Sequence, residues 1–160
     1  MKLFFSLLAL MNIGFFYLSD DQIKAEDFLI DDKVKFGTTI EDFVVLYNQP
    51  DSVFDRVNDF LGYEYKELYY GHNCFEFIDN KLNGFNLKTE QFYISYKDHN
   101  VLINESEDIV RELFERSYEE KYFINKEVQV TRVQFEDSDD YILFEMKDGK
   151  VISILTWTDF

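Results

Sequence analysis

One stretch of eight residues occurs twice in this chain, and it constrains the fold more than any other sequence feature. The first copy is Phe75–Leu82 and the second is Phe144–Val151, which gives an offset of 69 between them (144 minus 75). Each copy has an Asp-Asn or Asp-Gly pair near its centre, and these residues tolerate the positive φ that a type I′ turn requires. Each copy is therefore predicted to form two antiparallel strands joined by a two-residue turn.

Cross-strand partners follow by counting outward from the two turns. The expected pairs are Phe77 with Leu82 and Phe75 with Gly84 in the first copy, and Met146 with Val151 and Phe144 with Ser153 in the second. The outer pair of each copy would place a large ring opposite a small residue. The two copies are therefore expected to share one packing arrangement.

A helix is predicted ahead of each hairpin. Thr38 can begin the first helix with Glu41 as its capping-box partner, and Asn48–Pro50 ends it because proline disfavours helix in the residue before it. Asn104–Glu107 can cap the second helix. The apolar stripes are Ile40, Phe43, Val44 and Tyr47 in the first helix and Ile109, Val110, Leu113 and Phe114 in the second.

The spacing between helix and hairpin differs in the two copies. Aligning the Glu-Asp pair at 41–42 with the pair at 107–108 gives an offset of 66 (107 minus 41). Because the hairpins are offset by 69, three extra residues are expected between helix and hairpin in the second copy.

Alternation of side chains predicts further strands. From Gly62 the period is two, and Val128–Phe135 leads the second hairpin as the segment after Gly62 leads the first. Phe92–Tyr96 is another strand, whereas Val53–Leu61 fits either a helical turn or a loop. The order of elements predicts an α+β protein of two tandem helix-plus-antiparallel-sheet units in one compact domain. The first α+β repeat would span residues 26–98 and the second 99–160.

The N-terminal residues differ from the rest of the chain in composition. Met1-Lys2 is followed by an apolar run, Leu3–Leu18, and then by a polar stretch, which is the pattern of a secretory signal peptide. Residues 1–25 are therefore expected to lie outside the fold, with Ile23–Ala25 as a candidate cleavage region. A first core helix of a cytosolic domain and an uncleaved membrane anchor are the alternatives. Export predicts a periplasmic or secreted protein, and the alternative is a cytoplasmic one.

The net charge of the chain limits the classes of partner that it can bind. It has 16 Lys and Arg against 32 Asp and Glu, a formal net charge of −16, which repels nucleic acid and anionic membrane surfaces. Neither is expected as a partner, and the membrane enters only if the N-terminal segment stays uncleaved. Cys74 is the single cysteine and lies in an apolar segment, so we expect a buried structural thiol.

A catalytic set of residues is not recognisable. The two histidines, His72 and His99, lie in predicted turns without a nucleophile motif beside them. Glu136–Asp140 is the densest acidic cluster, but it lacks the glycine and the distant glutamate of a calcium loop, and no Cys/His spacing suits zinc. The chain is therefore predicted to be no enzyme and to need no metal or cofactor.

Aromatic residues are the candidates for binding. Tyr63, Tyr65 and Tyr69 alternate onto one face of a predicted strand, and Trp157 lies on the last strand. Core packing is the alternative role for each ring. Tyr and Trp are common at interfaces because they bury a large area and keep a polar group. These four residues are predicted to bind a protein or peptide partner on a sheet face that the helices leave open.

Several motifs together resemble a known family. They are Gly37-Thr38-Thr39 with Glu41-Asp42 at a helix start, Asn48-Gln49-Pro50 at its end, tyrosines on the next strand, and the Asp-Asn/Gly-Lys hairpins. Over residues 33–87 and 101–157 they are similar to the beta-lactamase-inhibitor-protein-like fold, which includes the SmpA/OmlA-type small outer-membrane lipoproteins. The resemblance implies an exported bacterial protein that binds other proteins with an open sheet face. The chain departs from it in having no lipobox cysteine and in having Asn48 where glycine is usual.

The leading hypothesis is an exported, non-enzymatic protein that binds a protein or peptide through an aromatic, acidic sheet face. The first alternative is a cytosolic acidic protein of the immunity type, which would neutralise a basic toxin. The second alternative is a small hydrolase or ligand-binding enzyme. It would need His72 or His99 in a pocket beside a carboxylate and a nucleophile.

Overall fold

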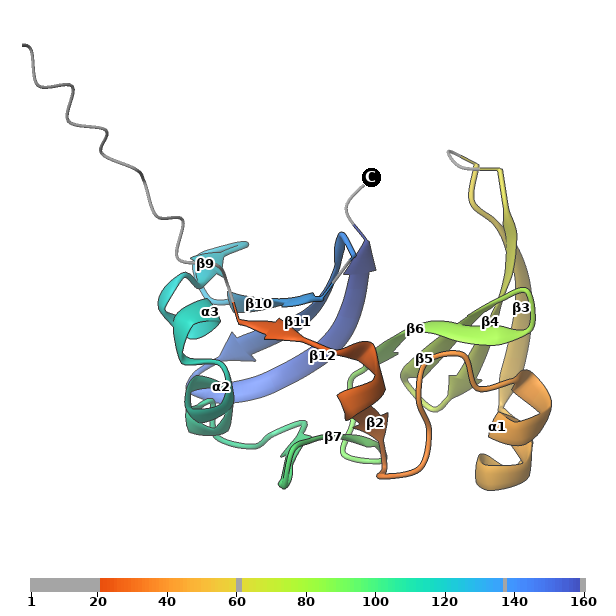
Figure 1. Ribbon diagram of the computed structural model, residues 1–160, viewed down its shortest axis with the longest axis horizontal. Coiled ribbons are helices and arrows are strands. Elements are labelled where there is room, and N and C mark those ends of the chain that lie inside the picture. Colours follow the sequence, from red (N-terminus) through yellow and green to blue (C-terminus); the bar gives the residue numbers. More distant parts are fainter. Residues whose placement is uncertain (1–20, 60–61, 137, 159–160) are drawn as a thin grey trace, which may run out of the picture.

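Both predicted hairpins lie in one nine-stranded sheet of the computed structural model, which describes residues 21–59, 62–136 and 138–158. The strand order is β1-β10-β11-β12-β6-β5-β4-β3, and β9 also pairs with β10 (Figure 1). The strands are β1 Gln22–Ile23, β3 Ser52–Val57, β4 Glu64–Tyr70, β5 Asn73–Ile78, β6 Lys81–Leu87, β9 Tyr122–Phe123, β10 Gln129–Phe135, β11 Asp140–Lys147 and β12 Lys150–Thr158. All neighbours are antiparallel except β1 and β10.

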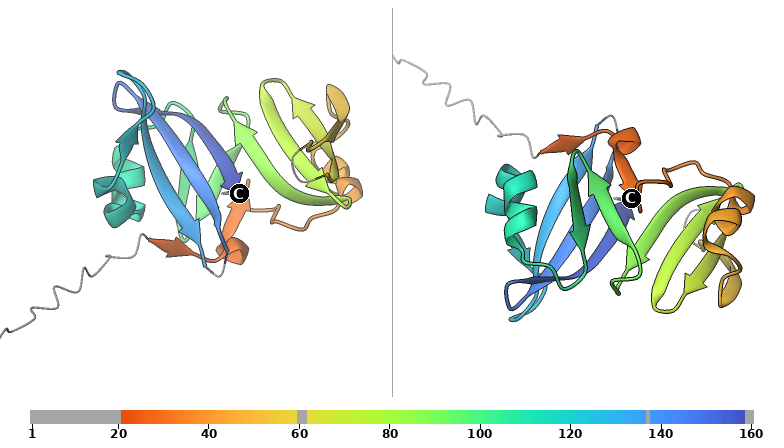
Figure 2. Two further views of the ribbon diagram at one scale, coloured as in Figure 1. Left: turned by 90° about the horizontal axis from the view of Figure 1, so that it is seen from above. Right: turned by 90° about the horizontal axis from the view of Figure 1, so that it is seen from below.

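A second, three-stranded sheet and the helices complete the domain. The small sheet has the order β2-β7-β8, with β2 Phe28–Ile30, β7 Tyr93–Tyr96 and β8 His99–Leu102. The helices are α1 Ile40–Tyr47, α2 Asp108–Leu113 and α3 Glu115–Glu119, with a 3₁₀ turn η1 at Ala25–Asp27. The result is a compact mixed fold of helices and antiparallel sheet in which strand predominates, as Figure 2 shows from above and below.

The helices and the small sheet all cover the same face of the large sheet. Phe43 of α1 lies 4.7 Å from Phe75 of β5, measured between ring centroids, and Phe114 beside α2 lies 5.3 Å from Phe144 of β11. Phe92, ahead of β7, lies 4.9 Å from Phe75. These rings are all fully buried, so the main core lies on this side. The described helices leave the opposite face uncovered, where Val130, Tyr141 and Leu143 form a separate small buried cluster.

Both hairpin turns are at the predicted places. Asp79 and Asn80 have φ of 49° and 65°, and Asp148 and Gly149 have φ of 51° and 74°. The inner pairs are confirmed, Phe77 with Leu82 and Met146 with Val151.

The predicted outer pairs are wrong because each hairpin contains a β-bulge, at Glu76/Phe77 and at Glu145/Met146. A bulge adds one residue to one strand and shifts the register beyond it. The observed pairs are Phe75 with Phe85, Phe144 with Ile154, Glu76 with Gly84 and Glu145 with Ser153. Large rings thus face large apolar residues on the core side, and the small residues face glutamates on the other.

The first helix begins one residue later than predicted. Thr39 is the N-cap, and its hydroxyl oxygen accepts a hydrogen bond from the Asp42 N–H at 3.2 Å. The segment that fitted a helical turn or a loop is mostly strand β3. It shows no alternation of polar and apolar residues because five of its six side chains are exposed at the edge of the sheet.

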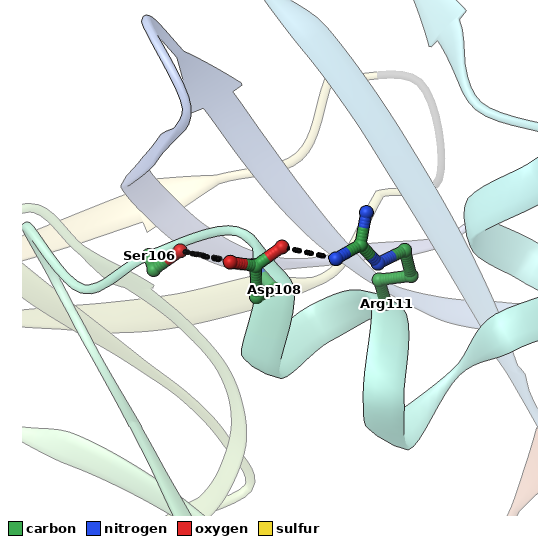
Figure 3. A network of polar contacts seen from close by, with 3 residues as sticks. All are labelled: Ser106, Asp108 and Arg111. Carbon is green, nitrogen blue, oxygen red and sulfur yellow. Dashed lines mark hydrogen bonds and ion pairs between the residues drawn. The ribbon is translucent and has the colours of Figure 1, made fainter.

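The second helix starts with a polar network that Figure 3 shows. The Ser106 hydroxyl donates to Asp108 Oδ2 at 3.0 Å, and Arg111 forms an ion pair with the other oxygen of Asp108. The helix is short, and Phe114 breaks it before α3 begins. Its predicted apolar stripe faces the core, with Val110 and Phe114 buried and Ile109 and Leu113 packed against them.

The fold begins earlier in the chain than predicted. Ile23 is 1 % exposed, and β1 pairs with Gln134 and Phe135 of β10. The Asp21 N–H donates to Ser117 Oγ, and Ser117 N–H donates back to the Asp21 carboxylate. Residues 21–25 are therefore part of the fold rather than outside it. The rest of the signal-like segment, residues 1–20, lies outside the described residues.

Candidate binding face

The open face is the side of the large sheet that carries Glu76 rather than Phe75. Directly opposite residues in an antiparallel sheet point to the same side, so the register identifies its members. In the first half they are Ser52, Phe54, Arg56, Tyr65, Glu67, Tyr69, Cys74, Glu76 and Ile78. In the second half they are Val130, Arg132, Gln134, Tyr141, Leu143, Glu145, Ser153, Leu155 and Trp157. The two halves of the sheet rise on either side of β6 and β12, where they join (Figure 1).

Aromatic rings line the first half of the open face. Tyr69 and Phe54 lie edge to face with their centroids 5.6 Å apart, and Tyr63 and Tyr65 do so at 6.0 Å. The Arg56 guanidinium lies 5.1 Å from the centre of the Phe54 ring, within cation–π range. Because these side chains are partly or largely exposed, the rings present both apolar area and hydroxyl groups to a partner.

Two glutamates face each other between these rings. Glu67 and Glu76 are direct partners across β4 and β5. Arg56 Nε and the Tyr69 hydroxyl both lie 3.0 Å from Glu67 Oε2. Burial, and then the charge of Glu67, raise the pKa of the Glu76 carboxyl. The single positive charge of Arg56 cannot balance both glutamates. Because the two carboxylates are half-buried, they favour binding of a further cationic group.

The same glutamates form the candidate metal cluster of the described residues. Ligand atoms of Glu67, Cys74 and Glu76 lie within 4.8 Å of one another. Thiolate and carboxylate suit zinc, and burial raises the pKa of the metal-free Cys74 thiol to about 11, so a metal would have to displace this proton at neutral pH. One oxygen of Glu67 is also engaged by Arg56 and Tyr69. The same carboxylates can also receive a cationic side chain, and Cys74 is the buried thiol that was expected.

The second half of the open face contains an apolar cluster. Val130, Tyr141 and Leu143 pack together with Leu155, and the Arg132 guanidinium lies 4.5 Å from the centre of the Tyr141 ring. Trp157 faces Tyr141 across β11 and β12 and is 50 % exposed. A large exposed indole beside a small apolar cluster is typical of a contact surface.

The predicted binding residues fall into two groups on this face. Tyr65 and Tyr69 lie on β4 and Tyr63 directly before it, whereas Trp157 lies on β12, with β5 and β6 between the two strands. The prediction missed Phe54, Arg56, Cys74 and Glu76. One signal was present, because Cys74 and Glu76 alternate with the core residues Phe75 and Phe77. No sequence signal marked Phe54 and Arg56 as members of the open face, because β3 was not recognised as a strand.

The two histidines lie at the ends of strands. His72 is exposed in the turn between β4 and β5, and His99 begins β8 in the small sheet. The acidic stretch 136–140 follows β10 and ends at the first residue of β11, Asp140, whose N–H donates a hydrogen bond to the Ser138 hydroxyl; Asp137 lies outside the described residues. Among the residues described, neither histidine belongs to the group of possible ligands formed by Glu67, Cys74 and Glu76.

No protein-family model, curated protein or solved structure matches the chain. Over the described ranges, no helix combines the length and the apolar character needed to cross a membrane.

Proposed function

We propose that this chain is a non-enzymatic binding protein that holds a protein or peptide partner on its open face. The supporting observation is the cluster of Tyr65, Tyr69, Glu67 and Glu76, which lies on the face that the helices leave uncovered. A basic side chain of the partner would lie against the two glutamates, and an apolar one against Trp157. The single thiol, Cys74, lies beside the two glutamates, but burial raises its pKa to about 11, so it is protonated at neutral pH and a weak nucleophile.

We also propose that the sheet consists of two tandem units of one design. Their bulges, at Glu76/Phe77 and Glu145/Met146, are related by the hairpin offset of 69 (145 minus 76). Leu82 N–H donates to Thr38 O at 2.8 Å, and Val151 N–H donates to Glu105 O at 3.0 Å. The acceptor residues ahead of the two helices, Thr38 and Glu105, are therefore offset by 67 (105 minus 38). The sequence alignment of the Glu-Asp pairs had given an offset of 66. With the offset of 67, the second unit has two extra residues between helix and hairpin, not three.

The pairing of β6 with β12, where the two proposed units meet, also supports two units of one design. β6 pairs with β12 at Asn86 opposite Leu155, and these two positions are related by the same offset of 69 (155 minus 86). Equivalent residues thus face each other, as a local two-fold axis requires. The two units place different chemistry on one surface, an acidic and aromatic cluster in the first and an apolar cluster in the second, so a partner that spans both units would contact both clusters.

A peptide-display experiment tests the binding proposal. A library of random peptides is selected on the wild-type chain, and bound clones are re-tested on two open-face variants, Tyr69→Ala and Trp157→Ala, and on a helix-face control, Val45→Ala. Val45 is 81 % exposed on α1 and on the other side of the sheet. We expect peptides rich in Lys and Arg that bind the control but not the open-face variants. Binding that survives both open-face substitutions would contradict the proposal.

Export from the cytoplasm is part of the proposal, and it is supported by the signal-like pattern of residues 1–18. The resemblance to the beta-lactamase-inhibitor-protein-like fold is consistent with an exported binding protein, and we retain it as a proposal. The immunity-type alternative uses the same acidic face against a basic toxin. The two differ in compartment, so the processing of the N-terminus distinguishes them.

A further inference from the structure

Strand β3 is an uncovered edge of the large sheet. It pairs with β4 on one side and ends the strand order on the other. Its exposed large apolar side chains are Val53, Phe54 and Val57, with exposed fractions of 50 %, 44 % and 57 %. Proteins usually protect such an edge with proline, a bulge or unpaired charge. Over its six residues β3 has no proline and no bulge against β4.

Alternate residues of β3 point their backbone groups away from the sheet. In an antiparallel pair, every second residue directs both its N–H and its C=O to the partner strand. The Asn58 N–H donates to the Tyr63 C=O at 2.9 Å, in the register that continues the β3–β4 pairing. The even-numbered residues of β3 therefore bond to β4. Val53, Asp55 and Val57 direct their N–H and C=O groups outward.

The charges of β3 are balanced within the same chain. Asp55 forms an ion pair with Lys66, and Arg56 forms one with Glu67 at 3.0 Å. The charges of these two pairs sum to zero, although the chain as a whole has a net charge of −16. The charges of β3 itself therefore add little repulsion when two copies meet at this edge.

We propose that β3 pairs antiparallel with β3 of a second copy of this chain, with Asp55 opposite Asp55. This register makes hydrogen-bonded pairs of all three outward-pointing residues, because Val53 then lies opposite Val57. The exposed valines of the two copies cover each other on the helix side. On the open face, Phe54 of one copy lies opposite Arg56 of the other, which repeats between chains the cation–π contact seen within one.

The central pair of aspartates is the weak point of this register. Like charges directly opposite each other are destabilising. Lys66 flanks Asp55 in each copy, so the row across the interface is Lys66, Asp55, Asp55, Lys66 and is neutral in total. The two-fold axis of this dimer is perpendicular to the sheet, so the open faces of both copies point the same way. The cluster of Tyr65, Tyr69, Glu67 and Glu76 in one copy then becomes a neighbour of the same cluster in the other.

The first test is molar mass in solution as a function of concentration, by light scattering and sedimentation equilibrium. We expect wild type to shift from monomer to dimer. Asp55→Pro removes an N–H that does not bond to β4, so this variant should keep its fold and stay monomeric. Asp55→Asn should dimerise a few fold more tightly because the like-charge pair is gone. Trp157→Ala, outside this interface, should behave as wild type and separates this test from that of the binding proposal.

A cross-linking test fixes the register and does not need the proline variant to fold. Opposed residues of a hydrogen-bonded pair have Cα atoms about 5.5 Å apart, which suits a disulfide. Asp55→Cys should form a disulfide-linked dimer under mild oxidation. Val57→Cys is the matched control, because its opposite residue is Val53 and not itself. Wild type that stays monomeric at every concentration, or equal cross-linking at both positions, would overturn the proposal.

Discussion

Phe43 shows how strongly the first half of the core depends on one side chain. It is fully buried, and its ring lies 4.7 to 5.8 Å from four others, those of Tyr47, Tyr70, Phe75 and Phe77. Truncation would leave a cavity that these rings cannot all close. Phe43→Ala is expected to lower the free energy of unfolding by about 3–5 kcal/mol. Val45→Ala, on the exposed side of the same helix, should change it by less than about 0.5 kcal/mol. Urea unfolding of both variants checks this, and similar losses would contradict it.

Glu76 makes the stability of the fold depend on pH. Burial and Glu67 raise its pKa above the ordinary 4.5, so the folded chain binds this proton more tightly than the unfolded chain does. The free energy of unfolding therefore falls as pH rises from about 4.5 through the folded pKa. The Glu76→Gln variant has no carboxyl proton to lose at this position, so its free energy of unfolding does not fall for this reason. Its stability relative to wild type should grow between pH 4.5 and neutrality, as measured by urea unfolding at each pH.

The control for this residue is the glutamate that faces it. Glu67 lies directly opposite Glu76, and its charge is the second cause of the raised pKa of Glu76, after burial. In a Glu67→Gln background, the pH-dependent gain from Glu76→Gln should therefore be smaller. An equal gain in both backgrounds would mean that burial alone raises the pKa of Glu76.

At the scale of elements, the two hairpin turns impose a requirement on backbone conformation. Gly149 has φ of 74°, where an ordinary side chain costs roughly 1–2 kcal/mol. Gly149→Ala should therefore lower the free energy of unfolding by about that amount. Gly149→Asn should cost less, because Asn tolerates this region and Asn80 occupies the equivalent place at φ of 65°. Thermal unfolding of the two variants measures the difference, and an alanine variant no less stable than the asparagine one would contradict it.

The sequence was informative where one local pattern decides the structure. Turn dipeptides placed both hairpins, and helical spacing placed α1, because these signals lie within a few residues. The bulges after Glu76 and Glu145 were not foreseen, since Phe-Glu-Phe and Phe-Glu-Met read as regular strand in either register. Strand β3 was missed because an edge strand exposed on both faces has no apolar period. The same reason hides Phe54 and Arg56, which join the open face only through pairing with β4.

At the scale of the whole molecule, one sheet joins elements far apart in the chain. Strand β1 at the start pairs with β10, and β6 in the middle pairs with β12 at the end. Phe36, in the loop before α1, stacks on Phe85 of β6 and meets Phe135 of β10 edge to face. The two halves of the sheet therefore share one core, and we expect them to unfold together rather than one at a time.

The role of β1 limits where an exported form of this chain can begin. Ile23 is buried, Glu136 N–H donates to Ile23 O at 2.8 Å, and Asp21 exchanges two hydrogen bonds with Ser117. A chain that starts at Glu26 would lose these contacts, and the burial of Ile23 alone is worth about 1.5–3 kcal/mol. A chain that starts at Asp21 should be more stable than one that starts at Glu26 by at least that amount, as measured by urea unfolding.

Intact mass and cell fractionation of the full chain, expressed with its own N-terminus, connect this limit to the function. If the protein is exported, the mature form should begin no later than Asp21, because cleavage after Ala25 would remove β1. Recovery outside the cytoplasm at such a mass would support the exported binding protein. Full-length mass in the cytosol would favour the immunity-type alternative, because an uncleaved cytosolic chain meets its basic partner there. A stable mature form that begins at Glu26 would contradict the role assigned to β1.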